Sequence, residues 1–206
     1  HTAMERLIQA YLARLRQWRE LNVLSYTGGN HRVGSGGPGI ADDLPAPGFD
    51  PLRVRTQDQW GCAAPQIFSD VSPKMHAEFA LDYELRWLSQ FGLNYYGCCD
   101  ALHNKLHLLK RIPNLRKVSV SPWANPEKMA AGIGREVVLS YKPSPAIFAA
   151  DGFDLPAARR ALEHALAQMR GCNVEIIMKD ISTVRGDPRR LWQWAEMAVE
   201  TAKKFG

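Results

Sequence analysis

The sequence predicts an α/β protein built on a parallel sheet. Two observations indicate this fold class: short apolar segments typical of strands alternate with segments of helical periodicity, and no two strands are joined by a hairpin turn. Strands separated by helices pair in parallel through right-handed crossovers. With 206 residues, 46% of them hydrophobic, the chain can bury the core of a single domain covering residues 1–206.

The first part of the chain predicts one helix, one strand and a long loop. Apolar residues recur at helical spacing from Met4 to Arg19, which is typical of an amphipathic helix. Residues 22–27 then resemble a strand. The Gly- and Pro-rich residues 34–51 form a loop that could act as a binding loop or lid. It contains the pattern G-x-G-x-x-G, but Pro38 within it prevents the helix that a dinucleotide site needs.

The rest of the chain repeats a strand-and-helix rhythm. Ser72 and Pro73 supply an N-cap and a first helical residue, and Asp187 and Pro188 do so for the last helix. The later strands are expected at residues 60–69, 92–100, 116–121, 136–142 and 173–179. The helices between and after them are expected at residues 73–91, 101–110, 125–133, 155–170 and 188–204.

Six predicted strands leave two architectures open. An eight-stranded (β/α)₈ TIM-type barrel usually needs about 250 residues. This chain is shorter and starts in a helix, so it would cover roughly the last six βα units of such a barrel. The alternative is an open parallel sheet.

Composition excludes several classes of function. The net charge is +5, but acidic and basic residues are mixed, without the basic face of a nucleic-acid-binding protein. No apolar run approaches the roughly 20 residues of a membrane span, and no signal peptide is evident. Four cysteines are too few for a disulfide scaffold. We therefore expect a cytoplasmic protein with reduced thiols, no nucleic-acid or membrane partner, and an anionic small-molecule substrate.

The most informative segment is Cys98-Cys99-Asp100, at the end of an apolar strand. Ligands and metals bind at the carboxyl ends of parallel strands, and thiolates are preferred ligands of Zn²⁺. In a regular strand the two cysteines would point to opposite faces, so they could share one ion only where the strand breaks. The alternative is a buried strand end with two packed cysteines.

From residue 72 onward the chain resembles the uroporphyrinogen decarboxylase superfamily. The resemblance rests on an ordered series of segments rather than on one motif. These segments are residues 71–79 (VSPKMHAEF), 93–100 (LNYYGCCD), 118–123 (VSVSPW), 137–143 (VVLSYKP) and 176–181 (IIMKDI). The resemblance implies a (β/α)₈ barrel without its first units.

The superfamily includes two chemistries. Its decarboxylases act without metal on tetrapyrrole acetate groups, whereas its corrinoid:thiol methyltransferases bind Zn²⁺ through a His-x-Cys pair and a distant Cys. In this resemblance Cys98 falls at the strand cysteine, Tyr96 replaces the histidine, and Lys179 and Asp180 lie near the last cysteine. A zinc site would therefore recruit Cys99, Asp100 or another residue. The implied metal ligands are Cys98, Cys99 and Asp100.

Other residues at strand ends are candidates for binding a ligand. Lys142 and Lys179 each close a strand, which suits a carboxylate or phosphate, although Lys179 could instead pair with Asp180. The remaining candidates for substrate binding are Asn30 and His31 after the first strand, Tyr96 and Trp123 as ring surfaces, and Arg185 as a further cation.

These observations lead to three functional hypotheses. The first is zinc-assisted methyl transfer from a corrinoid carrier to a small acceptor, with Cys98, Asp100 and Lys179 as catalytic residues. The corrinoid would be a co-substrate, held by a corrinoid protein. The second is metal-independent decarboxylation of a porphyrinogen-like polycarboxylate. The third is a non-catalytic module that binds a ligand or a partner. An incomplete barrel would also expose a sheet edge, so we expect a homo-oligomer or an N-terminal part that covers it.

Overall fold

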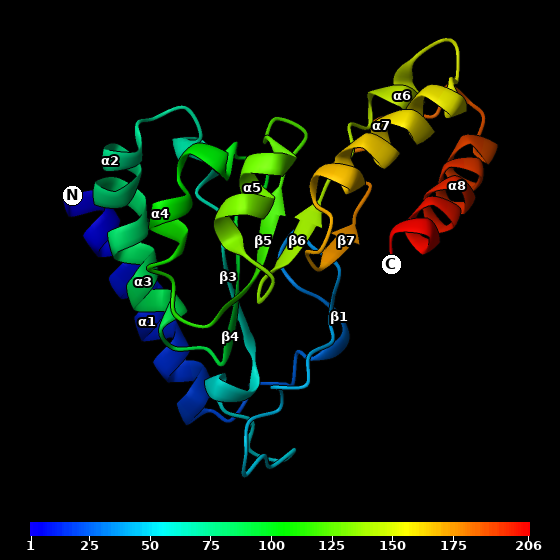
Figure 1. Ribbon diagram of the computed structural model, residues 1–206. Helices are drawn as coiled ribbons and strands as arrows, with labels where there is room; N and C mark the ends of the chain where they lie inside the picture. The colour runs from blue at the N-terminus through cyan, green and yellow to red at the C-terminus, as the bar shows by residue number, and fades with distance from the viewer.

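The protein is built on a parallel sheet of five strands that follow one another in sequence order. The computed structural model describes all residues 1–206, and its main sheet has the order β3-β4-β5-β6-β7 (Figure 1). These strands are β3 (Trp60–Ala63), β4 (Leu93–Tyr96), β5 (Leu115–Val120), β6 (Val138–Tyr141) and β7 (Val174–Ile176). All four pairings are parallel. The predicted α/β class is therefore confirmed.

The strand order agrees with part of a barrel. Each crossover moves the chain to the next strand in the same direction, as in a (β/α)₈ barrel, whereas a doubly wound sheet reverses its order. The sheet is open, with β3 and β7 at its edges. The chain therefore forms a five-stranded parallel sheet flanked by helices, and this sheet does not close into a ring.

The prediction for residues 22–39 was wrong in two respects. Residues 23–28 form no strand; they run beside β3, where the Trp60 amide donates to Thr27 Oγ1 at 3.2 Å. A hairpin follows instead, in which β1 (Gly29–Arg32) pairs antiparallel with β2 (Pro38–Gly39). The turn between them uses Gly34 at φ +55°, a conformation that glycine adopts without strain. The sequence prediction had treated this glycine-rich turn as part of a loop.

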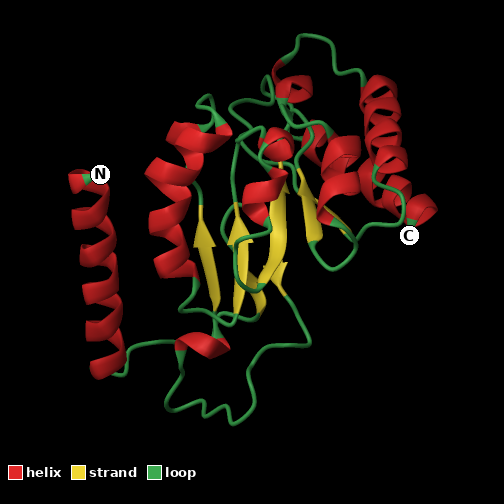
Figure 2. Ribbon diagram, turned by 60° about the vertical axis from the view of Figure 1, so that its left-hand side comes forward, coloured by secondary structure: helices red, strands yellow, loops and turns green.

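Helices cover one face of the sheet and also lie beyond its two lateral sides, next to β3 and next to β7 (Figure 1). α1 (Thr2–Glu20) packs on α3, while α7 and α8 pack together at the opposite end of the sheet (Figures 1 and 2). After α1, the helices are α2 (Pro73–His76), the π-helix η3 (Ala77–Leu81), α3 (Asp82–Leu88), α4 (Leu106–Leu109), α5 (Pro126–Ile133), α6 (Ala146–Ala149), α7 (Leu155–Gln168) and α8 (Arg189–Phe205). Three short 3₁₀ turns complete the fold: η1 (Thr56–Asp58), η2 (Gln66–Phe68) and η4 (Leu102–Asn104). No helix combines the length and the apolar character needed to cross a bilayer.

The hydrophobic core lies between the sheet and these helices. Twenty buried residues form one cluster, to which β4, β5 and β6 contribute every second side chain. These strand residues are Tyr96, Val118, Val120 and Leu139. Burial of such side chains is the main term that stabilises the fold.

The β1–β2 hairpin covers the opposite face of the sheet, which is apolar near β3 and polar on β5, β6 and β7. The apolar part is a second cluster of five buried residues: Val33, Leu44, Trp60, Leu93 and Tyr95. We call this whole face the hairpin face; Tyr95, Lys117, Ser119, Ser140 and Glu175 point into it by the two-residue alternation of strands. Lys117 Nζ donates to Pro38 O and lies 2.9 Å from Glu175 Oε2. Glu175 Oε1 in turn accepts from the Gly37 amide at 3.0 Å. A buried ion pair thus fastens the hairpin to the sheet.

Only the start of the predicted lid lies near the carboxyl ends of the strands. Ser35, in the hairpin turn, hydrogen-bonds to Tyr95 and Gly97. Beyond the hairpin the loop runs to the opposite end of the sheet, where Asp43 pairs with Arg116 at the beginning of β5 (Figure 1). Residues 40–51 therefore do not cover the strand ends.

We predict that the Lys117–Glu175 pair contributes strongly to stability. Lys117→Met leaves the Glu175 carboxylate without its cation, and the free energy of unfolding should fall by about 3 kcal/mol. Urea unfolding followed by circular dichroism measures the loss. The matched control is Lys204→Met, which breaks an exposed pair with Glu163 and should change stability by less than about 0.5 kcal/mol. Equal effects of the two substitutions would contradict the assigned role.

Candidate functional site

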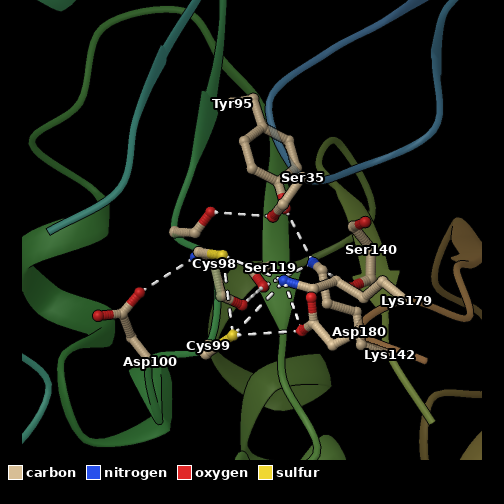
Figure 3. Close-up of polar contacts among 11 residues, drawn as sticks. Ser35, Tyr95, Cys98, Cys99, Asp100, Ser119, Ser140, Lys142, Lys179 and Asp180 are labelled. Carbon is tan, nitrogen blue, oxygen red and sulfur yellow. Dashed lines mark hydrogen bonds and ion pairs between the residues drawn. The ribbon is translucent and has the colours of Figure 1, made fainter. Parts of the chain in front are cut away.

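Strand β4 stops one residue before the two cysteines, and this break creates the site. Gly97 has φ +92°, and a Cβ atom there would lie 2.6 Å from Leu102 Cδ1, so the position requires glycine. Because the strand alternation ends here, Cys98 and Cys99 do not point to opposite faces. Their sulfur atoms lie 3.8 Å apart on the same side of the turn (Figure 3).

Three hydrogen bonds hold this turn. Asp100 Oδ2 accepts from the Cys98 amide at 3.0 Å, Ser119 donates to Cys98 O, and Ser121 donates to Asp100 O at 2.9 Å. Asp100 is fully buried, and its carboxylate lies on the side of the turn away from the sulfurs (Figure 3). The position of Asp100 therefore fixes the cysteine backbone, and the structure does not bring its carboxylate to the thiols.

The ammonium group of Lys179 lies between both thiols and a carboxylate. Its Nζ is 3.2 Å from Cys98 Sγ, 3.4 Å from Cys99 Sγ and 2.9 Å from Asp180 Oδ2 (Figure 3). Asp180 adopts φ +59°, and Cys99 Sγ lies 3.7 Å from Asp180 Oδ2. We call Cys98, Cys99, Lys179 and Asp180 the thiol site. Of the two alternatives considered for Lys179, the pairing with Asp180 is present, and binding of an anionic ligand stays a prediction.

The surroundings distinguish the two thiols. Burial raises the pKa of Cys98, but hydrogen bonds from Lys179, Ser35 and Cys99 more than offset this effect, so its pKa lies below the ordinary value. Burial and the adjacent Cys98 together raise the pKa of Cys99. Cys98 is therefore expected to become a thiolate at a lower pH than Cys99.

Lys142 lies beside this site but does not face open space. It is fully buried, and its Nζ donates to Tyr95 Oη at 2.9 Å and to Ser119 Oγ at 2.7 Å. Burial, followed by repulsion from Lys179, lowers the pKa of Lys142 to about 8. Because its hydrogen bonds are made to neutral groups of the sheet, Lys142 supports the thiol site rather than contacting a ligand directly.

A pocket of about 530 Å³ adjoins the thiol site. Lys179 and Asp180 form part of its wall, and Asn30 and Arg32 of the hairpin form the facing part, whereas neither cysteine lines it. Arg32 is exposed and forms no ion pair or side-chain hydrogen bond. We call this cavity the Arg32 pocket. The proximity expected for Asn30 and Lys179 is therefore present.

Four other predicted residues lie outside this arrangement. His31 is exposed, with Nδ1 3.1 Å from Gly28 O. Trp123 is 75% exposed, and Arg185 pairs with Asp151 and donates to Ala149 O, near α6. Tyr96 is fully buried on the helix face, where it contacts His76 and Glu84. The prediction that Tyr96 contacts a ligand was therefore wrong. Side chains alternate along the strand, so its neighbour Tyr95 points to the hairpin face and Tyr96 points to the helices.

Sequence reasoning missed Ser35, Tyr95 and Arg32. Ser35 Oγ lies 2.8 Å from Tyr95 Oη, which links the hairpin turn to Lys142. Counting alternation back from the buried core residues would have placed Tyr95 on the hairpin face. Ser35 and Arg32 gave no such signal, because their positions depend on a hairpin that pairs only two short strands.

The thiol pair alone fits a zinc ion, but the predicted ligand set does not. Tetrahedral Zn²⁺ with Zn–S bonds of about 2.3 Å separates two sulfurs by about 3.8 Å, and the Cys98–Cys99 separation is 3.8 Å. However, Asp100 lies on the far side of the turn, His103 accepts from the Asn125 amide, and the Lys179 ammonium contacts both sulfurs. No three His, Cys, Asp or Glu side chains are grouped to hold a metal ion.

Comparison with protein-family models and with curated proteins found no match for this chain. The fold and site therefore define its class: an α/β protein with consecutive parallel strands and a pair of thiols at the strand ends. The resemblance to the uroporphyrinogen decarboxylase superfamily stays a prediction.

We predict that Gly97 is required to keep the two sulfurs together. Gly97→Ala places a Cβ at a positive φ, so it should lower stability by about 1–2 kcal/mol. It should also weaken chelation of phenylarsine oxide, which needs both sulfurs, by about tenfold. Titration with the arsenical, with cysteine-resolved mass spectrometry, measures this effect.

The matched control for this prediction is Gly152→Ala, where no heavy atom lies within 4 Å of the added Cβ. It should leave both stability and chelation unchanged. Chelation of the arsenical by Gly97→Ala with wild-type affinity would show that the turn does not depend on this glycine.

Proposed function

We propose that this protein transfers a methyl group from a corrinoid carrier to a small thiol that carries a negative charge. The observation that carries the proposal is the position of the Lys179 ammonium, within 3.4 Å of both cysteine sulfurs and in the wall of the Arg32 pocket. A cation at this place stabilises a thiolate, which is the nucleophilic form of a thiol.

The Arg32 pocket supports a negatively charged acceptor. Arg32 and Lys179 both line it, and Asp180 is already paired with Lys179. A guanidinium binds a carboxylate or sulfonate through two parallel hydrogen bonds. Arg32 is therefore suited to bind the charged end of the acceptor, with the thiol end directed toward Lys179.

The chemistry would use the two thiols in different ways. Cys98 does not line the Arg32 pocket, but its sulfur lies 3.2 Å from Lys179 Nζ, which does. An acceptor thiol held against Lys179 would give its proton to the Cys98 thiolate, a general base of lowered pKa, and the new thiolate would pair with Lys179. The acceptor sulfur would then attack the methyl carbon, and the electron pair of the broken bond would stay with the corrinoid. In this scheme the ammonium lowers the pKa of the acceptor thiol, as zinc does in the methyltransferases that the sequence resembles, and no step requires a metal.

Metal-independent decarboxylation of a polycarboxylate is the second candidate. The observation that favours it is the free Arg32 guanidinium, which faces Lys179 across a pocket large enough for a small organic molecule. This candidate assigns no role to Cys98. A non-catalytic binding module would use the same cations without chemistry.

The partners follow from the same proposal. A corrinoid protein would approach the strand ends, where the thiol site lies. The open edges at β3 and β7 would be covered by further strands of a (β/α)₈ barrel or by a second copy of the chain.

We predict that the purified protein methylates mercaptopropionate with methylcobalamin as donor. Cys98→Ser should lower kcat by about 100-fold, because the general base is lost. Arg32→Gln should raise KM for mercaptopropionate about tenfold, with a small effect on neutral mercaptoethanol. Product formation is followed by mass spectrometry of the thioether.

Arg16→Gln, which removes an exposed arginine of α1, is the matched control and should leave both constants unchanged. Elemental analysis of the same preparation tests the metal directly: stoichiometric zinc that is lost in Cys98→Ser would replace the ammonium scheme with a zinc scheme. Absence of transfer, combined with Arg32-dependent binding of a porphyrinogen-like polycarboxylate, would favour decarboxylation.

A further inference from the structure

A second, apolar pocket of about 420 Å³ lies between α1, α3 and the end of β3. Twelve of its fourteen lining residues are hydrophobic. Four of them carry aromatic rings: Tyr11, Phe68, Tyr83 and Trp87. We call it the α1 pocket. It lies on the helix side of β3, away from the hairpin face that holds the thiol site.

Glu84 is the only charged residue in the wall of the α1 pocket. Its Oε2 accepts from Tyr96 Oη at 2.7 Å, while its Oε1 accepts no hydrogen bond. No lysine, arginine or histidine of the chain forms an ion pair with it. Glu84 is half-buried, and its Oε1 is therefore free to accept a hydrogen bond from a ligand in an otherwise apolar pocket wall.

The groups behind Glu84 do not supply the missing charge. Lys105 Nζ donates to Phe68 O, to Ser69 O and to His76 Nδ1 at 3.0 Å, which uses all three of its protons. His76 therefore carries its proton on Nε2 and donates to Tyr96 Oη at 2.8 Å. In the series Lys105, His76, Tyr96 and Glu84, each group thus donates a hydrogen bond to the next one, and His76 is neutral.

The charges near this series are unequal. Asp100 is buried and Glu84 is half-buried, and Lys105 is the buried ammonium near these two carboxyl groups. Burial, with a smaller contribution from the Asp100 charge, raises the pKa of Glu84 to about 7. A cation that enters the α1 pocket would balance the cluster.

We propose that the α1 pocket binds a protonated amine with an apolar chain or ring. The aromatic side chains suit such a ligand because a cation is attracted to ring faces, and the hydrophobic walls suit its carbon skeleton. The N–H of the ammonium supplies the donor that Glu84 Oε1 lacks. This site is independent of the proposed methyl transfer.

Three molecules with the same skeleton test the proposal: hexylammonium, hexanol and hexanoate. Isothermal titration calorimetry should show that hexylammonium binds at least about tenfold more tightly than hexanol, with hexanoate weakest. Glu84→Gln keeps an acceptor for Tyr96 but removes the charge, so it should abolish the preference for the cation and leave the affinity for hexanol unchanged.

Two further variants complete the test. Glu196→Gln removes an exposed carboxylate of α8 and should keep the full preference. Tyr11→Ala, at the half-exposed rim, should weaken hexylammonium binding severalfold without unfolding the protein. The proposal is overturned if hexylammonium does not bind at millimolar concentration, if it binds no better than hexanol, or if Glu84→Gln keeps the preference.

Discussion

The contact of one ammonium group with two sulfurs organises the functional end of this protein. Lys179 Nζ reaches Cys98, Cys99 and Asp180 at once, and it comes from the loop after the last strand of the sheet. The cysteines come from the end of β4, about 80 residues earlier in the chain. An ion pair of this kind stabilises the thiolate and also joins two distant strand ends. The ionisation of the thiol and the packing of the two strand ends therefore depend on the same contact.

The fold places these groups together by topology rather than by sequence proximity. Five parallel strands in consecutive order bring all carboxyl ends to one edge of the sheet. The hairpin then covers one face of the sheet, because Glu175 and Lys117 hold its backbone and Tyr95 holds Ser35. The same strands present their alternate side chains to the helices, so the sheet separates the main hydrophobic core from the face that the hairpin covers.

The sequence predicted the parallel sheet well because that signal is local and periodic. Five of the six predicted strands formed, as β3, β4, β5, β6 and β7. Ser72 caps the helix that follows β3, and Asn125 caps the helix that follows β5. It also placed Cys98 and Lys179 in one region, because parallel strand ends meet at one edge. Asn30 lies near Lys179 for a different reason: it belongs to the β1–β2 hairpin and does not follow a parallel strand.

Other features depended on interactions that no local pattern encodes. The hairpin and the position of Arg32 arise from contacts with β5 and β7 that are far away in sequence. The break at Gly97 decided both cysteine directions, and strict alternation would have separated them. Asp100 was predicted to face the thiols, but its carboxylate turns back to the Cys98 amide. Tyr96 was predicted to face the ligand, although it points to the helices and its neighbour Tyr95 points to the hairpin face.

The most direct test of this account is the pKa of Cys98, followed by ¹³C NMR of cysteine Cβ atoms across a pH titration. The account predicts that Cys98 ionises before Cys99, and that Lys179→Met raises the pKa of Cys98 while Lys128→Met, a change of an exposed lysine on α5, does not. If the two thiols titrate together in the wild-type protein, or if Lys179→Met leaves the pKa of Cys98 unchanged, the ammonium does not control the thiol pair and the account fails.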